Sequence, residues 1–203
     1  MPFNINSFKQ NGLVYGGARP SLFNVTLTPP AGLGLDNVSA QKFSFVCKTA
    51  ELPPSQVASF DVPYFGRKIK LAGDRTFTDW QVSVMNDEDF AVRAMFEKWS
   101  NALNRMVSNV RDPAIASENY KTDLEVTQYG KDGSEIRSYM IIGAFPTDIG
   151  AIALDWDQQS QLENFSVTFA YDYWVPNIEA SDKKAGGTNV YGGLANQDGP
   201  AGP

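Results

Sequence analysis

Several segments alternate apolar and polar residues with a period of two, the pattern of strands with one buried face. The clearest are SLFNVTLTPP, QKFSFVCK, TFTDWQVSVMN and ENFSVTFAYDYW. Their predicted inward faces are Phe23, Val25 and Leu27; Phe43, Phe45 and Cys47; Trp80, Val82 and Val84; and Phe165, Val167, Phe169, Tyr171 and Tyr173. The glycine-rich AGLGLDN between the first two favours a hairpin. DLEVTQY and IRSYMIIGAF, separated by the turn YGKDGSE, predict another hairpin, and GAFPTDIGAIALDW reads as a connection. A mainly β domain follows.

One segment changes to the helical period. NDEDFAVRAMFEKWSNALNRMV begins with Asn86 or Asp87 as a candidate N-cap and places acidic residues in the first turn, where the helix dipole favours them. Pro113 then prevents continuation. We expect the apolar stripe of this helix to cover a sheet rather than to bind a cofactor; it comprises Val92, Phe96, Trp99, Leu103 and Met106.

The segment 50–75 reads as a long loop with short extended pieces, because it contains three prolines and two glycines. Loops of this length inside a compact domain are usually functional. It also carries a basic cluster in an acidic chain. These residues, Arg67, Lys68, Lys70 and Arg75, are interpreted as a self-association contact that meets acidic surface on another copy; the alternative is a solvated loop.

Length and composition indicate a single domain with extended termini. The chain has 203 residues, too few for two full domains of ordinary size. Residues 1–20 read as an irregular N-terminal arm, residues 21–176 as the domain, and residues 177–203 as a tail rich in glycine, alanine and proline. No apolar run approaches membrane-spanning length, and the N-terminus lacks the pattern of a secretory signal, so we expect maturation in the cytoplasm.

Charge and residue types disfavour several functions. With 17 basic and 23 acidic residues the net charge is −6, which disfavours tight nucleic-acid binding through phosphate contacts. The chain has no histidine, so the commonest metal ligand and general base are absent. Its single cysteine, Cys47, is expected to be a buried small side chain. No phosphate-binding or dinucleotide motif is present, and we expect neither cofactor nor metal.

Two acidic clusters could in principle support catalysis or bind a hard metal ion. Asp87, Glu88 and Asp89 are explained by helix capping. Asp155 and Asp157 are explained by turn chemistry at a strand end, although a carbohydrate-active enzyme using this pair remains a distant alternative. No catalytic residue is assigned.

Five landmarks in order resemble the tail tube proteins of contractile-tailed bacteriophages: ARPSLFNV, FVCKTAELP, RKIKLAGDRTFTDWQVSVMNDE, GAFPTDIG and LDWDQQSQLENFSVTFAYDYW. They span residues 18–174, and the departures are PPAGLGLDNVSA and the tail. The resemblance implies two packed antiparallel sheets, sandwich-like or barrel-like, with one flanking helix and a long loop between rings. It implies hexameric rings that stack into a hollow tube inside a contractile sheath.

The same resemblance implies partners and a location. The partners are other copies, the sheath protein, and baseplate and tail terminator proteins, with the genome passing through without specific binding; the location is the virion tail, assembled in the host cytoplasm. The inter-ring contact is assigned to Phe65, Arg67, Lys68, Lys70 and Arg75. A lumen of negative charge would repel DNA phosphates, and its candidate residues are Asp79, Gln81, Asp123 and Glu125. The alternative is a tube subunit of a related bacterial device, a type VI secretion system or a tailocin.

Overall fold

The computed structural model describes residues 4–14, 16–113, 115 and 119–177. The predicted tail, 177–203, therefore lies outside the described residues apart from Asn177. The chain divides into two compact units, of which the larger comprises residues 24–126 and 139–176 and the smaller residues 1–23, 127–138 and 177–203. Each is described by itself below.

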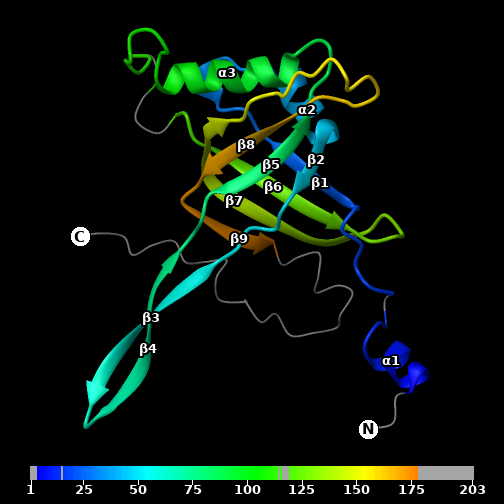
Figure 1. Ribbon diagram of the computed structural model, residues 1–203, viewed down its shortest axis with the longest axis vertical. Coiled ribbons are helices and arrows are strands. Elements are labelled where there is room, and N and C mark those ends of the chain that lie inside the picture. The colour runs from blue at the N-terminus through cyan, green and yellow to red at the C-terminus, as the bar shows by residue number, and fades with distance from the viewer. Residues whose placement is uncertain (1–3, 15, 114, 116–118, 178–203) are drawn as a thin grey trace. The chain divides into compact units, whose positions relative to one another are not determined.

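A seven-stranded sheet forms the centre of the fold (Figure 1). Its strand order is β1-β6-β7-β8-β5-β2, and β9 pairs with β7. The bounds are β1 Phe23–Leu27, β2 Cys47–Ala50, β5 Trp80–Met85, β6 Thr122–Tyr129, β7 Glu135–Ile149, β8 Asn164–Ala170 and β9 Tyr173–Asn177. β1 and β2 are the edge strands at the two ends of this order, and they do not pair with each other. The sheet is therefore open rather than closed into a barrel.

The predicted period of two decides which face of the central strands is buried. β5 pairs antiparallel with β8 in a register that places Trp80 opposite Phe169 and Val82 opposite Val167. These side chains have at most 1% exposure. The intervening pair, Gln81 and Thr168, lies on the other face. Most of the residues predicted to face inward in β1, β5 and β8 are buried, as the prediction requires. Phe23 and Tyr171 are only half-buried, and Tyr173, beyond the end of β8, is exposed.

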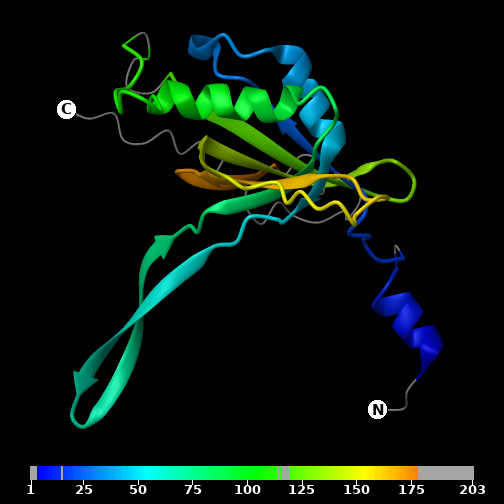
Figure 2. The same ribbon diagram turned by 45° about the horizontal axis from the view of Figure 1, so that its top comes forward.

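Two helices cover the apolar face of the sheet (Figure 2). α2 spans Asn37–Val46 and α3 spans Ala91–Leu103. Phe96 of α3 contacts Phe43 of α2 edge to face at 5.5 Å between ring centroids and Phe169 of β8 at 5.8 Å. Trp99 is fully buried, and its indole N–H donates to the Tyr120 carbonyl at 3.0 Å. The aromatic core therefore joins both helices to the sheet.

α3 is shorter than predicted at both ends. Asp87 and Phe90 close a turn first, with the Phe90 N–H donating to the Asp87 carbonyl, and the helix then starts at Ala91. It ends at Leu103, because Asn104 has an extended backbone. Met106 lies beyond that end and is 75% exposed, so its assignment to the apolar stripe is wrong.

Most of QKFSFVCK does not form a strand, since only Cys47 and Lys48 belong to β2, and the predicted hairpin with β1 is wrong. It forms the end of α2, which Asp36 caps by accepting hydrogen bonds from the Val38 and Ser39 N–H groups. AGLGLDN contains a 3₁₀ turn, Ala31–Leu33, rather than a hairpin turn. Phe45, predicted inward, is 84% exposed, whereas Phe43 is fully buried against α3. A helical turn and a strand can both bury Phe43 and Cys47, which is why local alternation misled the prediction.

β7 continues through the segment predicted as a connection. It ends at Ile149, and Pro146 is tolerated because the register with β8 shifts between Pro146 and Asp148. At such an irregularity the missing N–H of proline costs no regular ladder bond.

The smaller unit contains α1, Ile5–Asn11, where the sequence predicted an irregular arm. Asn4 caps this helix by accepting a hydrogen bond from the Asn6 N–H at 3.0 Å. The predicted turn between β6 and β7 is confirmed, since the Gly130 N–H donates to the Ser134 carbonyl at 2.7 Å.

The segment expected to be a long loop is a regular hairpin. β3, Gln56–Tyr64, pairs antiparallel with β4, Arg67–Thr76, and the two form the second sheet. A mainly β fold with two antiparallel sheets is therefore confirmed. The second sheet is this hairpin, and the flanking layer holds two helices instead of one.

Candidate assembly surfaces

The β3–β4 hairpin is exposed on both faces. Every residue of β3 is exposed, as is every residue of β4 except Gly73, which is half-buried. An isolated two-stranded hairpin is at best marginally stable in water, and a row of unpaired strand edges invites association with another chain. Within the larger unit, the hairpin lies outside the seven-stranded sheet (Figure 1). These properties suit a contact element.

The pairing register separates the hairpin into an apolar and a charged face. Directly opposed residues share a face, so Phe60 with Leu71 and Val62 with Ile69 form the apolar one. Each of these four side chains is between 37% and 52% exposed. On the other face Lys70 lies opposite Asp61 and Lys68 opposite Pro63. The Lys68 ammonium is 3.9 Å from the Asp61 carboxylate, a weak surface pair.

The hairpin turn presents an aromatic side chain at its tip. Phe65 and Gly66 both have positive φ, 43° and 77°, the geometry of a two-residue type I′ turn. A phenylalanine is rare at positive φ, and Phe65 is 91% exposed. Its ring meets that of Tyr64 edge to face at 4.6 Å. The turn therefore tolerates backbone strain while exposing an apolar ring to water.

The base of the hairpin is anchored to the large sheet. The indole N–H of Trp80 donates to the Glu51 carbonyl at 2.6 Å, and that of Trp174 donates to the Pro54 carbonyl at 3.0 Å. Arg75, predicted to be a contact residue, donates to the Ser55 hydroxyl at 2.9 Å. Arg75 thus lies at the base, whereas Phe65, Arg67, Lys68 and Lys70 lie at or near the tip.

The face of the large sheet opposite the helices is polar. Gln81 and Ser83 of β5 lie opposite Thr168 and Ser166 of β8 on this face. Residues 49–51 and 78–83, together with Pro54 and Ser166, line a shallow depression of about 410 Å³ there. Gln81 and Asp79 are among its lining residues, so two of the lumen candidates come together on this face.

The two remaining lumen candidates lie on β6. Asp123 is exposed and Glu125 half-buried, and they alternate with the buried Leu124 and Val126. The Asp123 carboxylate also accepts a hydrogen bond from the Gly143 N–H at 3.0 Å, so it is partly committed to holding β7. Alternation with buried neighbours places Asp123 and Glu125 on the face away from the helices.

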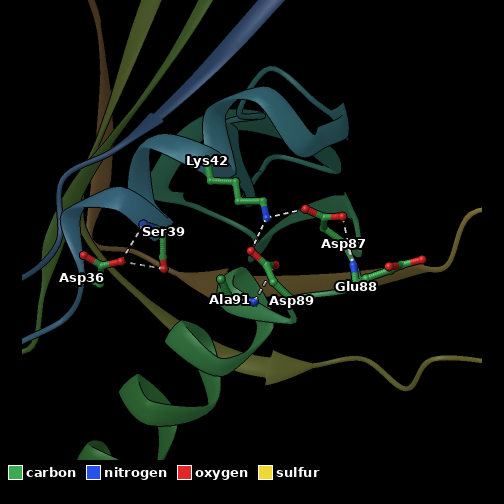
Figure 3. Close-up of polar contacts among 7 residues, drawn as sticks. All are labelled: Asp36, Ser39, Lys42, Asp87, Glu88, Asp89 and Ala91. Carbon is green, nitrogen blue, oxygen red and sulfur yellow. Dashed lines mark hydrogen bonds and ion pairs between the residues drawn. The ribbon is translucent and has the colours of Figure 1, made fainter.

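An ion-pair junction joins α2 to the turn before α3 (Figure 3). The Lys42 ammonium lies 2.5 Å from a carboxylate oxygen of both Asp87 and Asp89. Asp89 also accepts from the Ala91 N–H at 3.1 Å, whereas the Glu88 side chain points away from Lys42. The hydrogen bond to Lys42 lowers the pKa of both carboxyl groups below the ordinary value of 3.8. The N-cap of α3 is Phe90 and no acidic residue lies in the first turn, so the N-cap predicted at Asn86 or Asp87 is wrong. The acidic cluster instead holds the turn before the helix and bonds across 45 residues of chain.

We expect Lys42→Met to make stability less sensitive to acid. Because Asp87 and Asp89 have lowered pKa values in the folded protein, their stabilisation is present above pH 3.8 and is lost as the pH falls through those lowered pKa values. The effect should be small, as for other exposed ion pairs. Thermal unfolding from neutral pH down to about pH 2.5 would measure it.

Lys98→Met is the matched control for that experiment. The Lys98 ammonium donates to the Gly34 carbonyl at 2.7 Å and has no carboxylate partner among the described residues. Its Tm should follow pH in parallel with wild type. A parallel curve for Lys42→Met as well would show that the junction contributes nothing to acid stability.

The residues considered for catalysis do not form a site in the described structure. Asp155 and Asp157 lie on an exposed segment before β8 and line neither of the two described depressions. Across the described residues, no group of three or more acidic or cysteine side chains could hold a metal ion. None of the described helices has the length and apolar character needed to cross a membrane. Cys47 is buried, and burial raises the pKa of its thiol to about 12.

Two surface features were missed by sequence reasoning. One is the apolar face of the β3–β4 hairpin, although VASFDV and KIKL alternate with period two and could have revealed it. The other is Trp156, which is 98% exposed. Only the acidic residues beside it were considered, so the exposed indole was overlooked.

Comparison with known proteins shows which family the chain resembles in sequence. Residues 18–177 match a family model described as phage tail tube protein. The chain is 37% identical over 158 residues to the tail tube protein gp19 of Enterobacteria phage T4, covering 77% of this chain and 90% of that protein. It is 25% identical over 171 residues to the tail tube protein of Serratia phage KSP90, covering 82% and 93%.

Solved structures show the same fold at low sequence identity. The tube-terminating cap of the anti-feeding prophage aligns with a TM-score of 0.56 at 16% identity, covering 79% of this chain and 91% of that one. The sheath–tube complex of an extracellular contractile injection system aligns with a TM-score of 0.52 at 12% identity, covering 86% and 97%.

Proposed function

The chain belongs to the phage tail tube protein family, and from this premise we propose that it is a structural subunit whose hexameric rings stack into a hollow tube inside a contractile sheath. The observation that carries the proposal is the β3–β4 hairpin, whose apolar pairs are left in water by a single copy. Burying such a face against a second copy would recover the apolar contact that the subunit alone does not make.

Ring closure is supported by the open edges of the large sheet. β1 and β2 end the strand order, and each is short, with five and four residues respectively. Edge strands have unpaired backbone groups, and pairing them between copies around a ring removes those edges. We therefore assign contacts within a ring to β1 and β2 and contacts between rings to the hairpin.

The inter-ring contact uses both faces of the hairpin. The apolar face supplies buried area, while Arg67, Lys68 and Lys70 set the register by charge. Phe65 enters the neighbouring ring as an apolar anchor. Arg75, held at the base by Ser55, positions the hairpin from within its own subunit.

The polar face of the sheet is proposed to line the bore. It carries Asp79, Gln81, Asp123 and Glu125 without a facing helix. A bore of negative charge repels phosphate, so genomic DNA passes without specific binding. The sheath then contacts the helix side of each subunit, and baseplate and terminator proteins meet the two ends of the tube. The tube is part of the virion tail and assembles in the host cytoplasm.

A structural role without catalysis is consistent with the contacts of the acidic residues that were considered as catalytic candidates. Asp87 and Asp89 of the acidic cluster before α3 are engaged by Lys42, and Asp89 also accepts a hydrogen bond from the Ala91 N–H. The 37% identity to a phage tail tube protein favours a phage tail over a related injection device, since the solved injection-system structures share only the fold.

Electron microscopy of the purified protein at low and high salt tests the proposal, with light scattering to report particle mass. We expect hollow stacked rings, seeded where necessary by a baseplate–tube complex. A monomer that persists at every concentration even with that seed would contradict the tube function.

A charge placed in the bore should slow DNA passage. We expect phage particles built with Glu125→Lys subunits to eject their DNA several-fold more slowly, because each ring then presents new ammonium groups to phosphate. Glu125→Gln removes the same carboxylate without adding an ammonium group and should eject at close to the wild-type rate. Ejection from purified particles, followed by dye fluorescence, measures both. Equal rates for the two variants would place Glu125 outside the bore.

A further inference from the structure

The segment between β7 and β8 presents an apolar and acidic surface with no partner inside the subunit. We call residues 154–162 the crest. Leu154 is 80% exposed, Trp156 98% and Leu162 70%. Asp155 and Asp157 flank the indole, and neither forms an ion pair among the described residues. One oxygen of the Asp155 carboxylate accepts a hydrogen bond from the Asp157 N–H at 3.0 Å, which leaves its charge uncompensated. The crest therefore places three apolar side chains and two carboxylates without an ion-pair partner at the surface.

The crest is exposed although both of its ends are firmly held. At its start, Arg93 of α3 donates to the Gly150 carbonyl at 3.1 Å, and the Gly150 N–H donates to the Ser166 carbonyl at 2.7 Å. At its end, the Asn86 N–H donates to the Glu163 carbonyl at 2.8 Å. Anchors on α3, β8 and β5 thus fix where the crest leaves and re-enters the fold.

Trp156 differs from the other tryptophans of the chain. The indole N–H groups of Trp80, Trp99 and Trp174 all donate to backbone carbonyls. Within the described residues Trp156 has no such bond, and its ring is almost wholly in water. Tryptophan is enriched among the residues that dominate binding energy at protein interfaces. An exposed indole between two carboxylates is therefore a recognisable anchor for a partner that is both apolar and basic.

Several other carboxylates near the helix side already have partners. Lys42 engages Asp87 and Asp89, as Figure 3 shows, and Asp36 caps α2. Glu97 pairs with Arg93 at 2.9 Å. Asp155 and Asp157 remain available and lie directly beside exposed apolar side chains. The crest thus combines free negative charge with an apolar anchor.

We propose that the crest of one copy receives the β3–β4 hairpin tip of a copy in the adjacent ring. The tip has the complementary chemistry: Phe65 is 91% exposed, and Arg67, Lys68 and Lys70 follow it. Asp155 and Asp157 supply the acidic partners for these cations, and Trp156 with Leu154 packs against Phe65. The inference rests on the proposed function, since it names the receptor for the inter-ring contact.

The placement of the two surfaces fits a head-to-tail contact. Both belong to the larger unit, and in both views they lie at its opposite ends (Figures 1 and 2). Because the hairpin tip and the crest lie at opposite ends, they cannot contact each other within one subunit. Heterologous contacts of this kind propagate from copy to copy and produce an open stack rather than a closed dimer.

A charge-swap experiment tests the pairing. Asp155→Lys with Asp157→Lys, and Lys68→Glu with Lys70→Glu, should each raise the protein concentration needed for tube assembly by about tenfold or more, and combining all four changes should restore assembly. Glu88→Lys, a charge reversal outside the crest, should leave that concentration unchanged. Failure of the combined variant to recover, or an equal defect in Glu88→Lys, overturns the pairing.

Cross-linking provides a second test that is independent of charge. Tyr64→Cys and Gln158→Cys replace exposed side chains beside the two anchors and keep both Phe65 and Trp156, and the buried Cys47 does not compete for the reagent. Tubes carrying both changes should give a ladder of covalent multimers with a short bis-maleimide, and each single variant should stay monomeric on a denaturing gel. If the wild-type protein forms tubes but the double variant gives no ladder, the inference is wrong while the proposed function stands. Absence of tubes from seeded wild-type protein overturns the proposed function and the inference with it.

Discussion

Shortening the β3–β4 hairpin is expected to abolish tube formation while leaving the subunit folded. Replacing residues 58–74 by Asn-Gly joins Val57 to Arg75, which are already paired, through the type I′ turn that this dipeptide favours. The free energy of unfolding should change by about 0.5 kcal/mol or less, because the removed side chains are exposed. Sedimentation and electron microscopy report assembly, and urea denaturation reports stability.

A milder variant separates the tip from the rest of the hairpin. Phe65→Asn converts the strained turn to Asn-Gly, so hairpin geometry is retained or improved while the apolar anchor is lost. We expect fewer and shorter tubes without loss of Tm. Tubes of normal length and number from the shortened variant would remove the hairpin from the inter-ring contact altogether.

Trp99→Ala is expected to give the largest loss of subunit stability, about 3–5 kcal/mol. Trp99 is fully buried, stacks with Phe96 at 6.4 Å between ring centroids and contacts Phe169 at 6.5 Å. The truncation leaves a cavity under α3 and deprives the Tyr120 carbonyl of its donor. Trp99→Phe should lose less, because it keeps most of the ring contact.

Trp156→Ala is the matched control, since it makes the same chemical change at a side chain that is 98% exposed. Its free energy of unfolding should stay within about 0.5 kcal/mol of wild type, while tube assembly weakens. Urea denaturation below the assembly concentration measures both variants as subunits. Similar losses for the two would mean that the aromatic core under α3 does not dominate the stability of this fold.

How far the candidate site could be predicted differs from residue to residue. The basic cluster was readable, because Arg67, Lys68 and Lys70 stand out in an acidic chain. The structure around this cluster was not readable, because prolines and glycines suggested an irregular loop. The segment instead forms two paired strands, with one register shift between Val57 and Ser59, and places Phe60 and Leu71 on one face. Trp156 was missed because a lone tryptophan in a sequence gives no indication of whether it is buried.

The sequence by itself determined the strands whose two faces differ. β1, β5 and β8 alternate apolar and polar residues over their whole length, and only one register buries the apolar set, so the local pattern and the tertiary structure agree. It also determined the existence of α3 and, through five ordered motifs, the family. The strands and the helix could be predicted because their periodicity involves residues close together in the sequence.

The tertiary structure decided what depends on partners distant in the chain. QKFSFVCK could bury Phe43 as a strand or a helix, and contact with Phe96 of α3 is made by the helix. Asp87 and Asp89 form a satisfied junction only because Lys42 reaches them from α2, whereas Asp155 and Asp157 have no ion-pair partner among the described residues. The choice between helix and strand, and the pairing of each carboxylate, depend on which side chains meet across the fold. Only the tertiary structure shows these long-range contacts.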